Sequence, residues 1–242
     1  MAKEIYVLDH KVRLLQPENG FRTSLDSVML AAAVPVKAGE TILDMGCGVG
    51  GAAFCLLWRV PDAKLTGIDI NAEYVDLACQ NAGLNNREAE FSVADIRSYE
   101  SPLFNHVMIN PPFFEAGAHL SSPDEGKARA NGHIDEDLSI KDWIKAAHRL
   151  VRSNGSMTII YPSGGIDKII NALGNNKGGK SFGAIEIIPL WQREGAEARR
   201  VIIRAIKDRQ TPAKILPGIV LHKADGSYTV QAESVLRSGN KI

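Results

Sequence analysis

The chain has 242 residues, and its 28 basic side chains balance its 28 acidic ones. A hydrophobic share of 45% and a charged share of 23% are ordinary for a globular protein, and the length predicts one large domain with a sizeable core. No run approaches about 18 consecutive apolar residues, so no membrane-spanning helix is expected. The zero net charge argues neither for nor against a nucleic-acid partner.

The cysteine content indicates a reducing compartment. The three cysteines, Cys47, Cys55 and Cys79, are odd in number and form no C-x-x-C pair, so neither a disulfide framework nor a zinc site is expected. The charged N-terminus lacks the apolar stretch that a secretory signal needs. These features predict a cytoplasmic protein.

Short apolar runs alternate with stretches of helical period along most of the chain. Strands are expected at residues 41–45, 64–70, 90–93, 104–109 and 156–161, followed by a pair at 184–190 and 199–207. Helices are expected at 52–59, 71–82 with Asn71 as its cap, 138–151 and 166–173. This order predicts a Rossmann-like α/β fold, a doubly wound and mostly parallel seven-stranded sheet that ends in an antiparallel hairpin. We expect a single domain, with a core at 41–207 between extensions at 1–40 and 208–242.

A glycine-rich loop follows the first of these strands. Gly46, Gly48 and Gly50 permit a sharp turn and a close approach of a ligand to the backbone, and the helix behind them presents free N–H groups. Asp69 ends the second strand 21 residues after Gly48, where its carboxylate can accept hydrogen bonds from the two hydroxyls of a ribose. The pattern predicts a nucleoside bound across the carboxyl ends of the strands.

Two acidic residues discriminate between nucleoside cofactors. The glycines, with Gly51, also satisfy the dinucleotide pattern G-x-G-x-x-G, so a nucleotide-binding dehydrogenase is one candidate. Asp44 precedes the glycines, where it would repel a pyrophosphate but attract the sulfonium and ammonium groups of S-adenosylmethionine. Asp95 follows the third strand, where it can accept from an adenine amino group. An ordinary strand-to-helix turn and a solvated turn aspartate are the structural alternatives.

These residues, with Asn-Pro-Pro-Phe at 110–113 after the fourth strand, resemble the class I S-adenosylmethionine-dependent methyltransferases, in the branch that methylates planar nitrogens. The resemblance covers about residues 23–207. It implies S-adenosylmethionine as cofactor, S-adenosylhomocysteine as product, and no metal. The cofactor-binding residues that it implies are Asp44, Gly46, Cys47, Gly48, Gly50, Asp69, Ile70, Asp95, Ile96 and Asn110.

The catalytic residues that the resemblance implies are Asn110, Pro111, Pro112 and Phe113. In this branch the tetrapeptide binds the nitrogen to be methylated, which is a poor nucleophile because its lone pair is delocalised into a π system. The Asn110 side-chain oxygen and the Pro111 carbonyl can accept the two amino hydrogens, so that the lone pair points at the methyl group. The prolines keep the loop rigid, and Phe113 can stack on a flat substrate. The structural alternative is a proline-terminated edge strand with two core phenylalanines.

Two sub-branches share this tetrapeptide. Release-factor glutamine methyltransferases usually carry a helical N-terminal domain, for which segment 1–40 is too short. The chain resembles the adenine N6-methyltransferases of valine tRNA in size and at residues 21–34, 127–133 and 199–206, although Phe113 stands where tyrosine is frequent. This resemblance implies N6-methylation of adenine in structured RNA, foremost tRNA. Glutamine methylation of a protein factor and a non-catalytic nucleotide-binding module are the alternatives.

Basic residues indicate where RNA would bind. From Arg193 to Lys223 there are eight Lys or Arg and only three acidic residues, which fits either a solvated face or a phosphate-facing patch. The polar connection at 115–137 has the length of a functional loop. The candidate substrate contacts are Phe114, Lys127, Arg129, Arg199 and Arg200. The oligomeric state is left open between a monomer and a weak dimer.

Overall fold

The computed structural model describes residues 2–18, 23–112, 138–174 and 182–242. Four of the residues predicted for the site lie outside these ranges, namely Phe113, Phe114, Lys127 and Arg129. Within the described ranges, no helix is long and apolar enough to cross a membrane.

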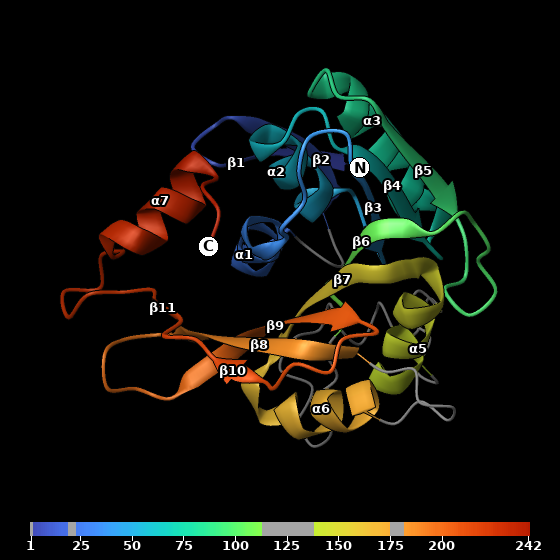
Figure 1. The fold of residues 1–242 in the computed structure, drawn as a ribbon. Helices are drawn as coiled ribbons and strands as arrows, with labels where there is room; N and C mark the ends of the chain where they lie inside the picture. The colour runs from blue at the N-terminus through green and yellow to red at the C-terminus, as the bar shows by residue number, and fades with distance from the viewer. Residues whose placement is uncertain (1, 19–22, 113–137, 175–181) are drawn as a thin grey trace.

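A nine-stranded sheet forms the centre of the molecule (Figure 1). Its strands lie in the order β10-β8-β9-β7-β6-β3-β4-β5, and β11 pairs with β8. Strands β3 to β7 run parallel, whereas β9 runs antiparallel to β7 and β8. The bounds are β3 Thr41–Met45, β4 Lys64–Asp69, β5 Ala89–Val93, β6 Phe104–Ile109, β7 Val151–Pro162, β8 Phe182–Trp191, β9 Ala198–Lys207, β10 Lys214–Ile215 and β11 Ile219–Val220.

The sheet confirms the predicted fold class. All seven predicted strands are present, and the last two form the predicted antiparallel hairpin. The sheet is larger than predicted because β10 and β11 extend it beside β8. Each of these has only two residues, which is too short for a periodic pattern to reveal.

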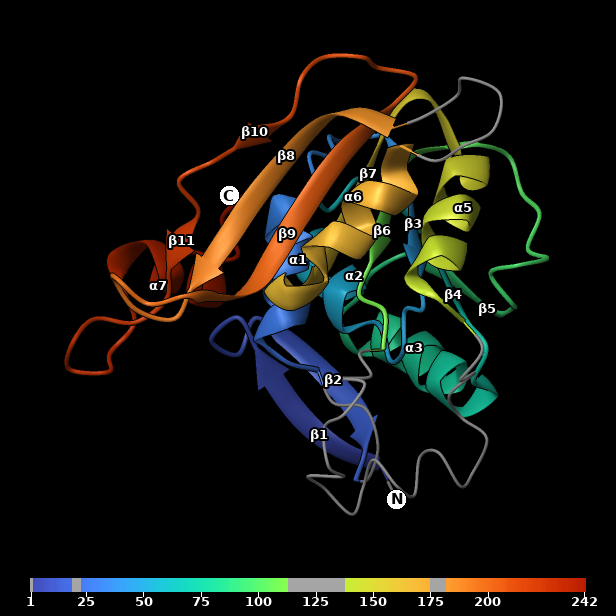
Figure 2. The same ribbon diagram turned by 90° about the horizontal axis from the view of Figure 1, so that it is seen from below.

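Helices cover both faces of the sheet (Figures 1 and 2). Alternate strand residues feed two separate cores, since Ile42 and Met108 pack with α1 and α2 while Leu43 and Ile109 pack with α5 and α6. The strands are apolar on both sides for this reason. The bounds are α1 Leu25–Ala33, α2 Gly51–Arg59, α3 Ala72–Leu84, α5 Ile140–Leu150, the 3₁₀ helix η1 Ser163–Gly165, α6 Ile166–Gly174 and α7 Val230–Ser238.

Polar side chains fix where most of these helices begin. Ser24 accepts from the Asp26 N–H at the start of α1, and Asn71, the predicted cap, accepts from the Glu73 N–H at the start of α3. Helix α2 differs, because its N-cap is Gly50 with a φ of +85° and no capping side chain. The first turn of α2 therefore depends on groups outside its own cap.

Strand β3 is the point where the strand order reverses. From β3 the chain continues to β4 and β5 on one side, and it then crosses to β6 on the other side. Such a reversal opens a crevice at the carboxyl ends of the two flanking strands. The glycine-rich loop follows β3 and Asn110 follows β6, so the two parts of the predicted site lie at this crevice.

A hairpin that the sequence did not reveal precedes α1. Strands β1, Ala2–Val7, and β2, Val12–Pro17, form a separate two-stranded sheet against α3 (Figure 2). Asn81, fully buried on α3, accepts from the Leu15 N–H at 2.7 Å and donates to the Leu15 carbonyl at 3.0 Å and to the Val49 carbonyl at 2.9 Å. One asparagine thus pairs with the edge of β2 and joins the hairpin to the glycine-rich loop.

The C-terminal segment returns to the first helix. Helix α7 packs against α1, and the N–H of Ile242 donates to the Ala32 carbonyl at 3.1 Å. The organisation as one domain, with a core at 41–207 and two extensions, stays a prediction.

Replacing Asn81 by alanine should destabilise the fold. Asn81→Ala leaves the N–H and carbonyl of Leu15 and the carbonyl of Val49 without their partner, which we expect to lower the free energy of unfolding by about 2–4 kcal/mol. Urea unfolding measures this, with the exposed neighbour Gln80→Ala as control. Equal stabilities of the two variants would contradict the bridging role of Asn81.

Candidate active site at the carboxyl edge of the sheet

The structure brings four predicted polar residues to neighbouring strand ends. Asp44 lies in β3, Asp69 ends β4, Asp95 follows β5 and Asn110 follows β6. Because these strands are parallel, paired in register and adjacent in the order β6-β3-β4-β5, the four residues lie along one edge of the sheet. The edge matches the location that the sequence predicts for a bound nucleoside.

The glycine-rich loop adopts a conformation that favours glycine. Gly46, Gly48 and Gly50 have φ values of +71°, +53° and +85°. A Cβ on Gly46 would lie 2.7 Å from Cη2 of Trp143, which is itself buried on α5. The Gly46 N–H donates to the Ile68 carbonyl at 2.8 Å, so the loop is wound against the end of β4.

Asp69 fastens this loop to the next helix. One carboxylate oxygen accepts from the Gly48 N–H at 2.8 Å, and the other accepts from the Asn71 N–H at 2.9 Å. Burial raises the pKa of Asp69, while these two hydrogen bonds oppose the rise. A carboxylate has further lone pairs beyond these two bonds, so the predicted contact with ribose hydroxyls is chemically compatible with the loop-fastening role.

Asp44 is the most deeply buried acid of the edge, with 2% of its surface exposed. The Ala53 N–H in the first turn of α2 donates to its carboxylate, and Oδ2 has no hydrogen-bond partner among the described residues. Burial, followed by the negative charge of Asp69, raises the pKa of Asp44 to about 8. A buried acid in this condition is suited to a cationic ligand, which would stabilise its ionised form.

Two asparagines complete a set of unpaired polar atoms at the edge. Oδ1 of Asn110 is buried and lacks a partner among the described residues, as does Nδ2 of Asn71. Pro111 is buried and Pro112 is exposed. Among the described residues, nothing prevents the Asn110 oxygen from accepting a hydrogen bond, which is what its predicted role needs. The roles of Pro112 and Phe113 stay predictions.

The remaining predicted cofactor residues have different surroundings. Asp95 accepts from the Arg97 N–H at 2.8 Å and from its guanidinium Nε at 2.9 Å, and Arg97 lowers the pKa of this carboxyl. Ile96 is buried in the core under α5, whereas 49% of Ile70 is exposed at the edge. Cys47 is a packed thiol whose pKa burial raises well above its ordinary value. The cofactor contacts of these four residues stay predictions.

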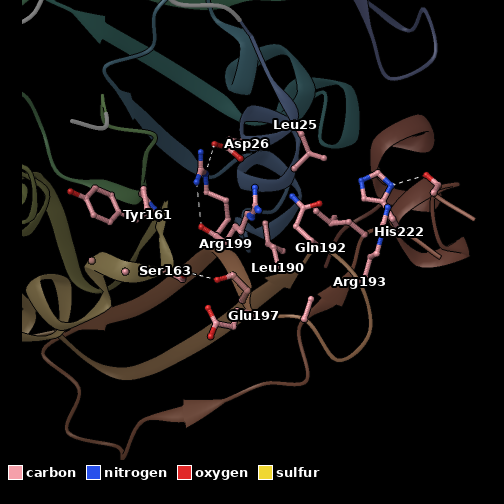
Figure 3. Close-up of a pocket in the computed structure, with 18 of the residues that line it drawn as sticks. Leu25, Asp26, Tyr161, Ser163, Leu190, Gln192, Arg193, Glu197, Arg199 and His222 are labelled. Carbon is pink, nitrogen blue, oxygen red and sulfur yellow. Dashed lines mark hydrogen bonds and ion pairs between the residues drawn. The ribbon is translucent and has the colours of Figure 1, made fainter. Parts of the chain in front are cut away.

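Arg199 and Arg200 line a separate groove of about 1650 Å³ at the same edge of the molecule (Figure 3). Tyr161 and Pro162, at the carboxyl end of β7, form part of its wall. Since β7 pairs with β6 in the sheet, this wall neighbours the strand end that carries Asn110.

The basic run from 193 to 223 is not one patch. Arg204 pairs with Glu186 and donates to the Ala33 carbonyl, and Lys207 donates to the carbonyls of His148 and Val151. These two side chains are engaged in holding elements together. Of the eight basic residues, Arg193, Arg199 and Arg200 reach the groove.

Three further residues of interest carry no sequence motif of their own. Asn71 reads as a helix cap, yet its amide nitrogen is left unpaired at the edge. Asn81 supports the loop from behind, and Lys168 of α6 lines the groove. Of these three residues, only Asn71 could have been predicted as a site residue, because it lies two residues after Asp69 at the end of β4.

The unpaired atoms fit the chemistry of S-adenosylmethionine. An acid oxygen, an amide oxygen and an amide nitrogen can meet the ammonium, carboxylate and hydroxyl groups of such a molecule. When bound, it would supply an activated methyl group on a sulfonium. Asp44 and Asp69 are the residues that would hold it through charge and hydrogen bonds. Among the described residues there is no group of three or more His, Cys, Asp or Glu placed to hold a metal ion.

Comparison with known sequences identifies the domain. Residues 22–123 match the family model of the methyltransferase small domain. The chain is 27% identical over 212 residues to a tRNA1(Val) (adenine(37)-N6)-methyltransferase of Aeromonas hydrophila, a match that covers 86% of this chain and 85% of that protein. It is 28% identical over 236 residues to the enzyme of the same name from Shewanella sediminis, covering 90% and 91%. These matches favour a methyltransferase over a dehydrogenase.

Comparison with solved structures shows the fold. A protein described as a predicted O-methyltransferase from Agrobacterium tumefaciens superposes with a TM-score of 0.70 at 24% identity, covering 89% of this chain and 97% of that one. The T. thermophilus 16S rRNA N2 G1207 methyltransferase gives a TM-score of 0.56 at 16% identity, covering 86% of this chain and 50% of that one. The chain is therefore an S-adenosylmethionine-dependent methyltransferase that has the fold of the class I methyltransferase structures and is similar to the tRNA1(Val) adenine N6-methyltransferases.

Proposed function

We propose that this chain transfers a methyl group from S-adenosylmethionine to the exocyclic N6 amine of an adenine in structured RNA, foremost tRNA. The observation that carries the proposal is Oδ1 of Asn110, which follows β6, the strand beside the one that carries Asp44, and is buried without a hydrogen-bond partner among the described residues. A buried oxygen without a donor fits a ligand N–H. A planar amine is such a donor.

The chain needs to supply positioning rather than a strong base. Asn110 Oδ1 and the Pro111 carbonyl would accept the two hydrogens of the amine, which favours a more tetrahedral nitrogen whose lone pair is less delocalised into the ring. The C–N bond forms as the C–S bond breaks, and the sulfur keeps the electron pair. The amine is then cationic and gives its extra proton to water. Alignment of two reactants accounts for most of the acceleration in such a transfer.

RNA is favoured over a protein substrate by two observations. The names of the relatives specify adenine in tRNA, and four basic residues line a groove next to the Asn110 strand end. A glutamine side chain would present the same planar amine to Asn110. The nature of the substrate therefore rests on the relatives and on the groove, not on the amine-binding residues.

Labelled product identifies the substrate directly. Incubation with methyl-labelled S-adenosylmethionine and unmodified total tRNA, followed by digestion to nucleosides, should place the label on N6-methyladenosine. A parallel incubation with protein extract tests the glutamine alternative. Label recovered on protein glutamine and absent from tRNA would overturn the proposed substrate.

Asn110→Ala should abolish transfer while leaving the cofactor bound. Loss of the acceptor oxygen misplaces the amine, so we expect kcat on tRNA to fall by about 10²–10³-fold. Asn110→Asp keeps an acceptor oxygen in the same place and should retain more activity than the alanine variant. Calorimetric titration with S-adenosylhomocysteine serves as the control. Near-normal kcat in Asn110→Ala would remove the proposed role of Asn110.

Stability should depend on pH through Asp44. The folded-state pKa of about 8 exceeds the ordinary value of 3.8 that the group regains on unfolding, so the folded protein holds the extra proton between these values. Stability therefore falls as pH rises through this window. In urea unfolding, we expect the free energy of unfolding of Asp44→Asn, taken relative to that of wild type, to rise by up to about 1.4 kcal/mol per pH unit. The exposed Asp62→Asn is the control, and equal pH profiles for both variants would refute the buried-acid account.

A further inference from the structure

A groove near the strand end that carries Asn110 is not used by the methyl-transfer site. Its walls come from segments far apart in the chain: the start of α1, the end of β7, the β8–β9 connection and residues near His222. Figure 3 shows Gln192, Arg193 and His222 gathered at one end and Tyr161 at the other. Tyr161 and Pro162 follow Ile159, which pairs with Ile109 directly before Asn110. The groove thus begins next to the strand end whose Asn110 is predicted to hold the amine that accepts the methyl group.

The groove carries more positive than negative charge. Lys168, Arg193, Arg199 and Arg200 line it, against the acids Asp26 and Glu197. Lys168, Arg193 and Arg199 are exposed and form no ion pair with any residue in the described ranges. Exposed cations without counter-ions in a concave surface are suited to phosphate groups.

One of the two acids is already neutralised. Asp26 lies in the first turn of α1 and accepts from Nε of Arg200 at 3.0 Å. A second guanidinium nitrogen of Arg200 donates to the Arg199 carbonyl at 3.3 Å. This pair fixes the wall between α1 and β9 and leaves Glu197 as the one acid of the described lining without an ion pair.

The polar character of the lining favours a nucleic-acid backbone over an apolar ligand. Besides the charged residues, the lining includes the Gln192 amide, the Ser163 hydroxyl, which donates to the Ala198 carbonyl, and three glycines, of which Gly164 and Gly226 face open space. A Cβ on either glycine would meet nothing within 4 Å, so the backbone there is open to close approach. A phosphodiester chain needs both distributed cations and hydrogen-bond donors.

We propose that this groove binds the phosphate backbone of the RNA whose adenine reaches Asn110. The inference rests on the proposed function and adds the surface that holds the substrate. Lys168, Arg193 and Arg199 contact phosphates, while Arg200, fixed by Asp26, shapes the wall between them. Backbone contacts of this kind position a nucleic acid without reading its bases.

The salt dependence of RNA binding tests the groove. The triple variant Lys168→Ala, Arg193→Ala, Arg199→Ala is compared with Lys37→Ala, Lys64→Ala, Arg152→Ala. The control removes the same three charges from exposed positions at the opposite, amino edge of the sheet. The probe is a fluorescent, unmodified valine tRNA transcript, and Kd is measured over a series of salt concentrations.

The groove variant should bind RNA more weakly at low salt. We expect its slope of log K against log salt to shrink by up to about 2–3, since each of three lost phosphate contacts removes about 0.7–0.9. The control variant should keep the wild-type slope. In methylation assays the groove variant should show a raised KM for tRNA, with kcat and the affinity for S-adenosylhomocysteine unchanged.

Two results would overturn the groove assignment: equal slopes for the two triple variants, or no RNA binding by wild type. The labelled nucleoside separates this failure from failure of the proposed function. Equal slopes with label on N6-methyladenosine reject the groove alone. A groove-dependent slope with label on another nucleoside supports the groove and rejects the adenine assignment.

Discussion

A buried carboxyl group, with no ion-pair partner in the part of the chain that the structure describes, is the constraint on which the carboxyl edge depends. Asp44 is enclosed by strands β4 and β6 and by the start of α2, whose Ala53 N–H donates to it. Its second oxygen has no partner among the described residues, and Asp69 adds a like charge nearby. In the free protein the Asp44 carboxyl keeps its proton, which avoids the free-energy cost of a buried negative charge. A bound cation would exchange for that proton.

The residues on the two sides of β3, where the strand order reverses, have different roles. On the β4 side, Asp69 ties the glycine-rich loop to the start of α3, and Asn81 of α3 holds the same loop through the Val49 carbonyl. On the β6 side, the end of β7 lies beside the strand end that carries Asn110, and the basic groove begins there. A cofactor on the first side and an RNA on the second would meet where β3 and β6 adjoin.

Strong periodic segments could be predicted from the sequence, and weak or long-range features could not. The seven main strands and the cap at Asn71 follow from local pattern, as do Asp44, Asp69 and Asn110 at one edge. The β1–β2 hairpin was missed because its turn places Leu8, Asp9 and His10 at positive φ without a glycine to mark it, and because contacts from the distant Asn81 and Asn85 support β2. The sequence left the basic run open between a solvated face and a phosphate-facing patch, because it does not show that Arg204 and Lys207 contact other elements from β9. Pairing over such distances leaves no local signature.

Proton release on cofactor binding tests the central claim most directly. Calorimetric titration of S-adenosylmethionine at about pH 7, in buffers of different ionisation enthalpy, counts the protons exchanged. Comparison with Asp44→Asn cancels any titration of the ligand itself. If a cation replaces the Asp44 proton, wild type releases close to one proton more than the variant. Identical proton counts would mean that Asp44 does not meet the cofactor's charge, and the account of this edge would be wrong.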